Sequence, residues 1–269
     1  MNLDVIVAAV LALILAWLIW FVWSVARGDV RSRWWRAARV LAAAVVALVI
    51  VGAAAYQLMN SRTVQLMGDH VARVETSRKV VAITFDDGPN DLFVTELIAD
   101  LKRFRARGTF YVVGAAAAEH PYALSSLVAS GQEIGNHSYT HRRLVFLRTV
   151  MAKDEVDSTD AVIRGAGFAG RITVRPPYAK KLLSLPWILW RQDRTAVMWD
   201  LEPDSLPIAG DPAAMTRYVL GNVRPGSIVL LHPWSIQNAA TREALPMILA
   251  GLRKRGFRFV TVSELLSLR

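Results

Sequence analysis

Cysteine is absent from the 269 residues, and histidine occurs only five times. The chain therefore cannot form disulfides or bind a metal through thiolates, so any metal site must use histidine and carboxylate ligands. No Lys or Arg precedes residue 27, and no charged residue occurs at 5–26 or at 40–61. A helix of about 20 apolar residues crosses the hydrocarbon core of a membrane, so both stretches qualify as transmembrane spans.

Two other interpretations of these stretches are a signal peptide and a buried helical hairpin. A signal peptide is disfavoured because no positive charge precedes the first stretch and no small-residue cleavage pattern follows it before Arg27. A core hairpin is disfavoured because residues 5–25 are apolar on every side. We therefore predict a two-helix transmembrane hairpin at 1–60, a polar connector at 61–78 and a folded domain at 79–269.

The segment between the spans is basic, with five arginines against the single Asp29. By the positive-inside rule this loop is cytoplasmic, so the chain crosses the inner membrane twice and the folded domain faces the periplasmic side. That topology makes the lipid bilayer a partner of the chain and argues against nucleic acid as a partner. No obligate protein partner is indicated. The net charge of +10 fits either a generic basic surface or attraction to anionic lipids or envelope polymers.

From residue 79 onward, strand-like and helix-like segments alternate, which predicts an α/β domain with parallel strands and crossover helices. About 190 residues is somewhat short for an eightfold barrel. Short polar motifs follow five of the strand-like runs, where enzymes of this class place their chemistry. These motifs are TFDDGP (84–89), HSYTH (137–141), RPPY (175–178), WDLEPD (199–204) and LLH (230–232).

Two of these motifs together could hold a metal ion. Adjacent Asp86 and Asp87 can have different roles: one can bind a cation, and the other can accept protons from water that the cation activates. His137 and His141 stand at i and i+4, a spacing that puts two imidazoles on one face of a helical turn. Asp87 with the two histidines would leave open coordination positions, as catalytic metal sites do.

The remaining motifs offer an anion-binding residue and an acid. Arg175 lies in a loop stiffened by two prolines, where it could orient a base or bind an oxyanion. His232 follows a strand-like run and is suited to protonating a departing nitrogen near neutral pH. Asp200 could orient that imidazole.

The motifs resemble, in order and spacing, those of the NodB-homology polysaccharide deacetylases, carbohydrate esterase family 4, over about residues 79–269. The resemblance implies a distorted (β/α) barrel of about seven strands that hydrolyses N-acetyl groups of an aminosugar glycan and releases acetate. It assigns these roles: Asp86 as base; Asp87, His137 and His141 as ligands of Zn²⁺, or of Co²⁺, Ni²⁺ or Mn²⁺; Arg175 as the residue that positions Asp86; the Tyr178 N–H as oxyanion donor; Leu230 in the acetyl pocket; and His232 as acid with Asp200 as its partner.

One departure from the family pattern leaves the substrate open. The family's fourth motif often ends in Asp-Trp, whereas Ser205 follows Asp204 here, so Trp199, Trp234 or Tyr178 would have to supply the aromatic wall. Deacetylation or deformylation of a lipid-linked sugar, an O-acetyl xylan-type esterase and a non-catalytic glycan-binding protein stay as alternatives. The apolar segment 182–190 (LLSLPWILW) is either a packing helix or a face that lies on the membrane or on a lipid-linked substrate.

Overall fold

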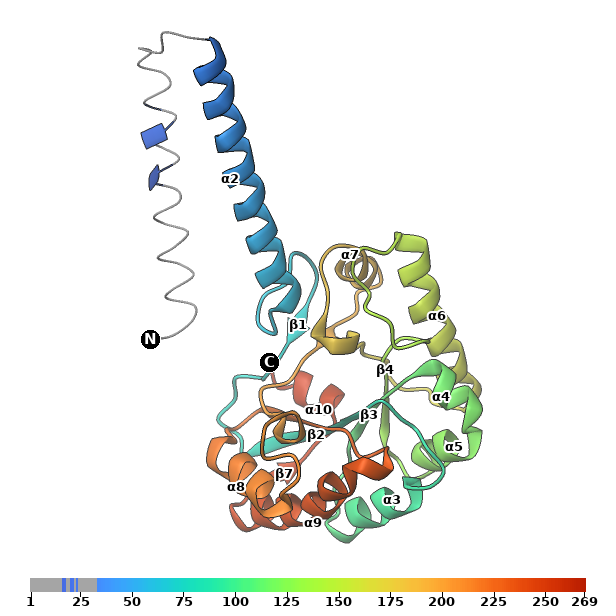
Figure 1. Cartoon of the computed structure of the whole chain (residues 1–269). Coiled ribbons are helices and arrows are strands. Elements are labelled where there is room, and N and C mark those ends of the chain that lie inside the picture. Colours follow the sequence, from blue (N-terminus) through green and yellow to red (C-terminus); the bar gives the residue numbers. More distant parts are fainter. Residues whose placement is uncertain (1–15, 18–19, 22, 24–32) are drawn as a thin grey trace. The chain divides into compact units, whose positions relative to one another are not determined.

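The computed structural model describes residues 16–17, 20–21, 23 and 33–269. The chain divides into two compact units, Met1–Leu58 and Met59–Arg269 (Figure 1). The segment 61–78, predicted as a connector, lies in the second unit and contributes its first strand.

Helix α2 (Arg33–Asn60) is the long helix of the first unit. Its part Ala37–Asn60 is long and apolar enough to cross a membrane, which agrees with the second predicted span at 40–61. The first predicted span, at 5–26, falls mostly outside the described residues, so the two-helix hairpin stays a prediction.

Seven strands form in the described part of the second unit, and all of their pairings are parallel. Five strands join in the order β4-β3-β2-β6, with β7 also paired to β2, while β1 pairs with β5. Their bounds are β1 (His70–Val71), β2 (Val80–Asp86), β3 (Thr109–Val112), β4 (Glu133–Asn136), β5 (Ala196–Val197), β6 (Ser227–Leu231) and β7 (Arg258–Phe259). The predicted parallel α/β class is confirmed.

Single bridges connect the β1–β5 pair with the larger sheet. Val174 bridges β4 at Asn136 and β5 at Ala196, and Leu201 bridges β6 at Val229. Arg73, just after β1, also bridges Ser227 of β6 in the antiparallel sense. The distorted barrel of about seven strands stays a prediction.

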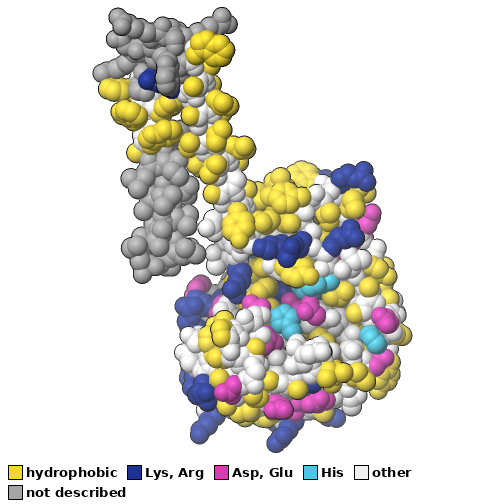
Figure 2. Space-filling view, viewed as in Figure 1, with side chains coloured by type: hydrophobic (Ala, Val, Ile, Leu, Met, Phe, Trp, Pro, Cys, Tyr) yellow, Lys and Arg dark blue, Asp and Glu magenta, His cyan; other side chains and the backbone are white. Residues whose placement is uncertain are grey.

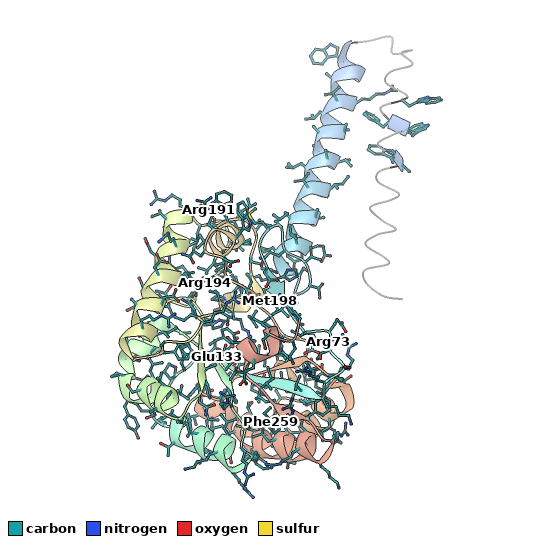
Figure 3. All side chains as sticks on the ribbon, turned by 180° about the vertical axis from the view of Figure 1, so that it is seen from behind. Arg73, Glu133, Arg191, Arg194, Met198 and Phe259 are labelled. Carbon is teal, nitrogen blue, oxygen red and sulfur yellow. The ribbon has the colours of Figure 1, made fainter. Side chains whose placement is uncertain are left out.

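Helices surround the strands of the second unit (Figure 1). They are α3 (Val94–Arg103), α4 (Gly114–Glu119), α5 (Pro121–Ala129), α6 (Thr149–Gly165), α7 (Ser184–Arg191), α8 (Pro212–Asn222), α9 (Ala239–Lys254) and α10 (Val262–Leu266). Arg194, labelled in Figure 3, donates two hydrogen bonds to the Asp160 carboxylate at 2.6 and 3.1 Å, which ties α6 to the chain just before β5.

Helix α7 settles part of the question raised by the apolar segment 182–190. Leu185 and Leu189 are fully buried against the domain, so the packing interpretation is confirmed for that side of the helix. Trp187 and Trp190 remain 44% and 51% exposed on the other side. Whether these indoles meet a membrane stays a prediction.

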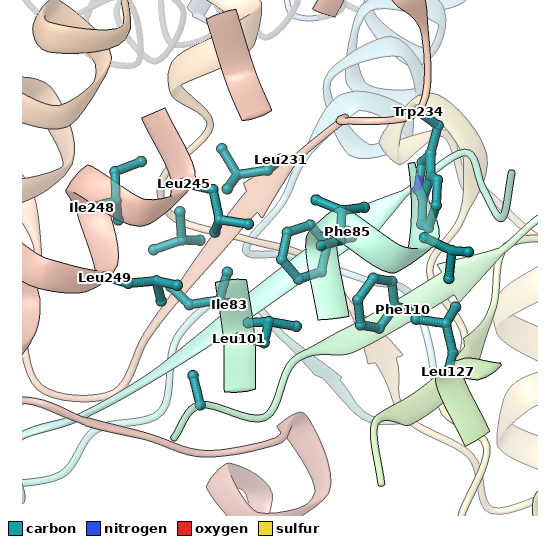
Figure 4. Packing of buried hydrophobic residues seen from close by; sticks show 14 of the residues in the cluster. Ile83, Phe85, Leu101, Phe110, Leu127, Leu231, Trp234, Leu245, Ile248 and Leu249 are labelled. Atoms are coloured by element: carbon teal, nitrogen blue, oxygen red, sulfur yellow. The ribbon is translucent and has the colours of Figure 1, made fainter. Parts of the chain in front are cut away.

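The core lies between the central strands and the helices α3, α5 and α9. Phe85 of β2 stacks on Phe110 of β3 with ring centroids 4.5 Å apart, and Leu231, Leu245 and Leu249 pack nearby (Figure 4). Every residue of β2 is buried, which explains why its sequence is a nearly continuous apolar run rather than an alternating one. This packing fixes the carboxyl ends of β2, β4 and β6, where the predicted motifs begin.

Candidate active site

Two acids stand at the carboxyl end of β2 and differ in exposure, although a carboxylate oxygen of each lies 3.5 Å from His137 Nε2. Asp86 ends the strand and is 1% exposed, whereas Asp87 has a left-handed φ of 74° and a side chain that is 45% exposed. Gly88 follows, where a Cβ atom would lie 2.1 Å from the Trp234 ring, so no larger residue fits unless that indole moves. The turn thus gives adjacent carboxylates different surroundings.

The two histidines converge through a loop and not through a helical turn, which corrects the prediction from their spacing. Ser138 and His141 have left-handed φ angles of 64° and 54°, so the chain folds back on itself. Glu155 of α6 holds this loop, because its carboxylate accepts hydrogen bonds from the N–H groups of Tyr139 (2.9 Å) and Thr140 (2.8 Å). Sequence reasoning did not identify this role of Glu155.

Asp87, His137 and His141 bring one potential ligand atom each within 4.8 Å of one another. The Nδ1 atom of His137 lies 2.8 Å from the carbonyl oxygen of Arg175, so Nδ1 carries the proton and Nε2 is left to bind a metal. Asp87 Oδ1 lies 3.5 Å from that Nε2 and 3.1 Å from His141 Nε2. Ligand atoms about 2.0 to 2.2 Å from a common ion are separated by roughly such distances, so the three side chains fit a divalent metal.

The charge state of Asp87 also suits a cation. Burial alone would raise the pKa of its carboxyl, but the interactions with His137 and His141 hold that pKa well below the ordinary value of 3.8. The carboxylate is therefore ionised at neutral pH.

Arg175 is fully buried beside Asp86. Its Nη1 donates to Asp86 Oδ1 at 2.7 Å and to Thr84 Oγ1 at 2.9 Å, while Nε and Nη2 donate to the carbonyls of Val197 and Met198, both at 3.2 Å. The guanidinium also lies over the Tyr111 ring, 4.1 Å from its centroid. Such a network leaves Asp86 only one orientation and compensates its buried charge.

The partner of His232 is Asp204 and not Asp200, which corrects the sequence prediction. His232 Nδ1 lies 3.2 Å from Asp204 Oδ1, and its backbone N–H donates to Asp204 Oδ2 at 2.6 Å. Asp200 instead accepts from Ser227 Oγ (2.7 Å) and from the N–H of Ile228 (2.8 Å), so it braces β6. Burial by itself lowers the pKa of His232, but the hydrogen bond and charge of Asp204, with the charges of Asp86 and Asp87, raise that pKa to about 9.

Tyr178 stands in the short helical turn Pro177–Ala179 with a left-handed φ of 57°. Among the described residues its backbone N–H makes no hydrogen bond. Its side chain is 52% exposed, and its ring centroid lies 4.7 Å from that of His141.

These groups line one cavity of about 590 Å³. Of the predicted residues it includes Asp86, Asp87, His137, His141, Tyr178, Trp199 and His232; it also includes Asn60, Arg62, Glu202, Asp204 and Ser205, which sequence reasoning did not assign. Histidine and acidic side chains are visible together on the face drawn in Figure 2. Two other predicted contacts do not line it: Leu230 is fully buried in β6, and Trp234 is 8% exposed and packs against Phe110 (Figure 4).

Known proteins share this arrangement of sequence and fold. The sequence model of the family described as polysaccharide deacetylase matches residues 73–189. A peptidoglycan-N-acetylglucosamine deacetylase of Bacillus cereus is 31% identical over 199 residues, which cover 72% of this chain and 91% of that protein. A chitooligosaccharide deacetylase of Sinorhizobium fredii is 32% identical over 206 residues, which cover 70% of this chain and 92% of that protein. The crystal structure of the Bc1960 peptidoglycan N-acetylglucosamine deacetylase superposes with a TM-score of 0.69 at 27% identity, covering 74% of this chain and 94% of that one.

Proposed function

The chain belongs to the polysaccharide deacetylase family, and on that premise we propose that it hydrolyses N-acetyl groups of an aminosugar-containing glycan, releasing acetate and leaving a free amine. The observation that carries this proposal is the convergence in one cavity of Asp86, which Arg175 holds from behind, the three potential metal ligands and His232.

Each role follows from the surroundings of the residue. Asp86, held by Arg175, accepts the proton of the attacking water. A divalent cation held by Asp87, His137 and His141 would supply Lewis acidity, lowering the pKa of the water and polarising the acyl oxygen; we propose Zn²⁺, with Co²⁺, Ni²⁺ or Mn²⁺ as other candidates.

The later steps need an anion-binding group and an acid. The N–H of Tyr178, which has no intramolecular acceptor among the described residues, is suited to hold the developing oxyanion. His232 is protonated at neutral pH because its pKa is raised to about 9, so it can give a proton to the leaving nitrogen. The C–N bond then breaks, and acetate and amine separate.

We also propose that the strands wrap as a distorted barrel, and that residues 5–26 and 40–61 form a two-pass anchor with the catalytic unit on the periplasmic side. An alkaline phosphatase fused to the C-terminus should then be active. If a reporter that works only in the cytoplasm is active at that position, the catalytic unit faces the cytoplasm. The substrate would then be a cytosolic sugar and not an envelope glycan.

The proposed activity is tested with the full chain in detergent, by measuring acetate released from a chitooligosaccharide, peptidoglycan and acetylated xylan, with Asp86→Asn as the blank. Release from the first two, absent in the mutant, is the expected result. Faster release from xylan would indicate an O-acetyl esterase. No release from any substrate would favour the non-catalytic alternative.

A further inference from the structure

The residues that leave helix α2 are fixed onto the catalytic unit next to the Tyr178 turn. The carbonyl of Met59 accepts a hydrogen bond from the N–H of Lys181 at 3.3 Å, and the carbonyl of Ser61 accepts one from Lys181 Nζ. Lys180 Nζ donates to Asn60 Oδ1. Lys181 is 1% exposed, and this partly buried attachment places Asn60 and Arg62 in the wall of the cavity.

Arg62 is a cation in this wall with unused hydrogen-bonding capacity. Its guanidinium lies over the Trp199 ring at 5.2 Å and 3.7 Å from Glu202 Oε2, and its side chain is 46% exposed. Within the described residues that guanidinium donates no hydrogen bond. The 3.7 Å separation is too long for a hydrogen bond, so the ion pair does not occupy the donors of Arg62. Glu202 accepts from Trp199 Nε1 (2.6 Å) and Ser205 Oγ (2.7 Å).

The other acids of the cavity have closer partners. Asp86 is bonded to Arg175, and Asp204 to His232. Asp87 faces the two histidines. A second guanidinium, that of Arg143, lies 5.0 Å from the centroid of the Tyr178 ring, which lines the same cavity. In Figure 2, Lys and Arg side chains border the face on which the histidines are visible.

We infer that Arg62 binds an anionic group, a carboxylate or a phosphate, carried by the glycan close to the acetylated amine. The planar fork of a guanidinium matches both groups, and stacking on Trp199 presents it without the ordering that a free side chain would need. This inference rests on the proposed deacetylase function and adds to it a class of substrate.

The test compares wild type, Arg62→Ala and Arg62→Lys as full-length proteins in detergent, with Arg217→Ala as the matched control. Arg217 also pairs loosely with an acid, Asp211 at 3.8 Å, and is 72% exposed, but it does not line the cavity. The substrates are neutral chitotetraose, a tetrasaccharide alternating N-acetylglucosamine with hexuronic acid, the same tetrasaccharide with its carboxylates methyl-esterified, and N-acetylglucosamine linked through a diphosphate to a polyprenol.

Wild type should favour an acidic substrate over the neutral one in kcat/KM. Arg62→Ala should reduce that preference about 10- to 100-fold, mainly through KM, because a hydrogen-bonded ionic contact is lost. Arg62→Lys should restore part of it, and Arg217→Ala should leave it unchanged. An effect confined to the uronic acid substrate identifies a carboxylate, and one confined to the polyprenol substrate identifies a phosphate. An equal effect on acidic, esterified and neutral substrates would overturn the inference.

Failure of the proposed function gives a different result. If wild type releases acetate from none of the four substrates, the deacetylase assignment fails. Calorimetric titration of the acidic and the esterified tetrasaccharide against Asp86→Asn, with and without Arg62→Ala, then still decides the role of Arg62. The polyprenol-linked sugar is titrated in the same way. Tighter binding of the acidic tetrasaccharide or of the polyprenol-linked sugar that depends on Arg62 would support the inference, and binding of every form that is unchanged by Arg62→Ala would overturn it.

Discussion

Replacing Arg175 by methionine should strongly destabilise the catalytic unit. The side chain is fully buried, and its guanidinium donates hydrogen bonds to Asp86, to Thr84 and to two backbone carbonyls. Methionine fills a similar volume over the Tyr111 ring but offers no donor and no charge. The substitution therefore leaves a buried carboxylate without its cation and two carbonyls without donors.

The expected loss follows from the buried ion pair. Removing one member of such a pair costs about 3–5 kcal/mol, a large part of the 5–15 kcal/mol typical of a domain. For a unit the size of Met59–Arg269, each kcal/mol lowers the melting temperature by about 2–4 °C, so Tm should fall by roughly 6–20 °C.

Circular dichroism melts of the full chain in detergent measure this loss, with Asp86→Asn and the double mutant Asp86→Asn/Arg175→Met completing a cycle. Because the double mutant removes both charges, it should be more stable than the sum of the two single losses predicts, by about 1–3 kcal/mol. A Tm of Arg175→Met within about 2 °C of wild type, or strictly additive losses, would refute the argument that Asp86 and Arg175 each need the other's charge in the buried site.

Three further changes separate the roles of the site residues. Asp86→Asn should abolish acetate release while metal content stays near that of wild type, because the amide keeps the shape of the carboxylate but accepts no proton; comparable activity would mean that another group is the base. His141→Ala should lower bound metal at least 10-fold by elemental analysis, and unchanged content would remove His141 from the ligands. In wild type the activity should decline as the pH rises through about 9, where His232 loses its proton. Asp204→Asn should move that decline to lower pH, and Asp200→Asn should leave it in place. The reverse pattern would mean that Asp200 is the partner of His232.

Much of the fold could be predicted because the strands of a parallel sheet are buried on both faces. The run before Asp86 is apolar throughout, and the structure makes it β2, the strand at the centre of the sheet. The motifs after β2, β4 and β6 accordingly meet at one edge, as a parallel arrangement requires. The predicted alternation of strand-like and helix-like segments from residue 79 onward is also confirmed, with α5, α8 and α9 among the helices between strands.

What the sequence could not supply were contacts set by loop geometry. The i, i+4 spacing of His137 and His141 is compatible with a helix, and only the left-handed φ angles of Ser138 and His141 reveal a loop. Asp200 and Asp204 lie in one motif, and choosing between them as the partner of His232 needs the path of the chain after β5.

The place of Arg62 in the cavity wall depends on contacts with residues far along the chain. The segment that carries it is attached through the Ser61 carbonyl to Lys181, 120 positions away. No local pattern in the sequence reports such a contact. The same is true of the Glu155 carboxylate that holds the histidine loop.

Stripping the full-length protein of metal with a chelator and titrating one divalent ion back tests most directly whether this site is a metal-dependent deacetylase. Acetate release from an N-acetylated oligosaccharide should vanish in the stripped protein and return in proportion to bound Zn²⁺. It should reach its plateau at about one ion per chain, as expected for Asp87, His137 and His141, the one such set of ligands within the described part of the chain. Full acetate release by protein shown to hold no metal, or recovery that does not follow occupancy of this site, would contradict the account.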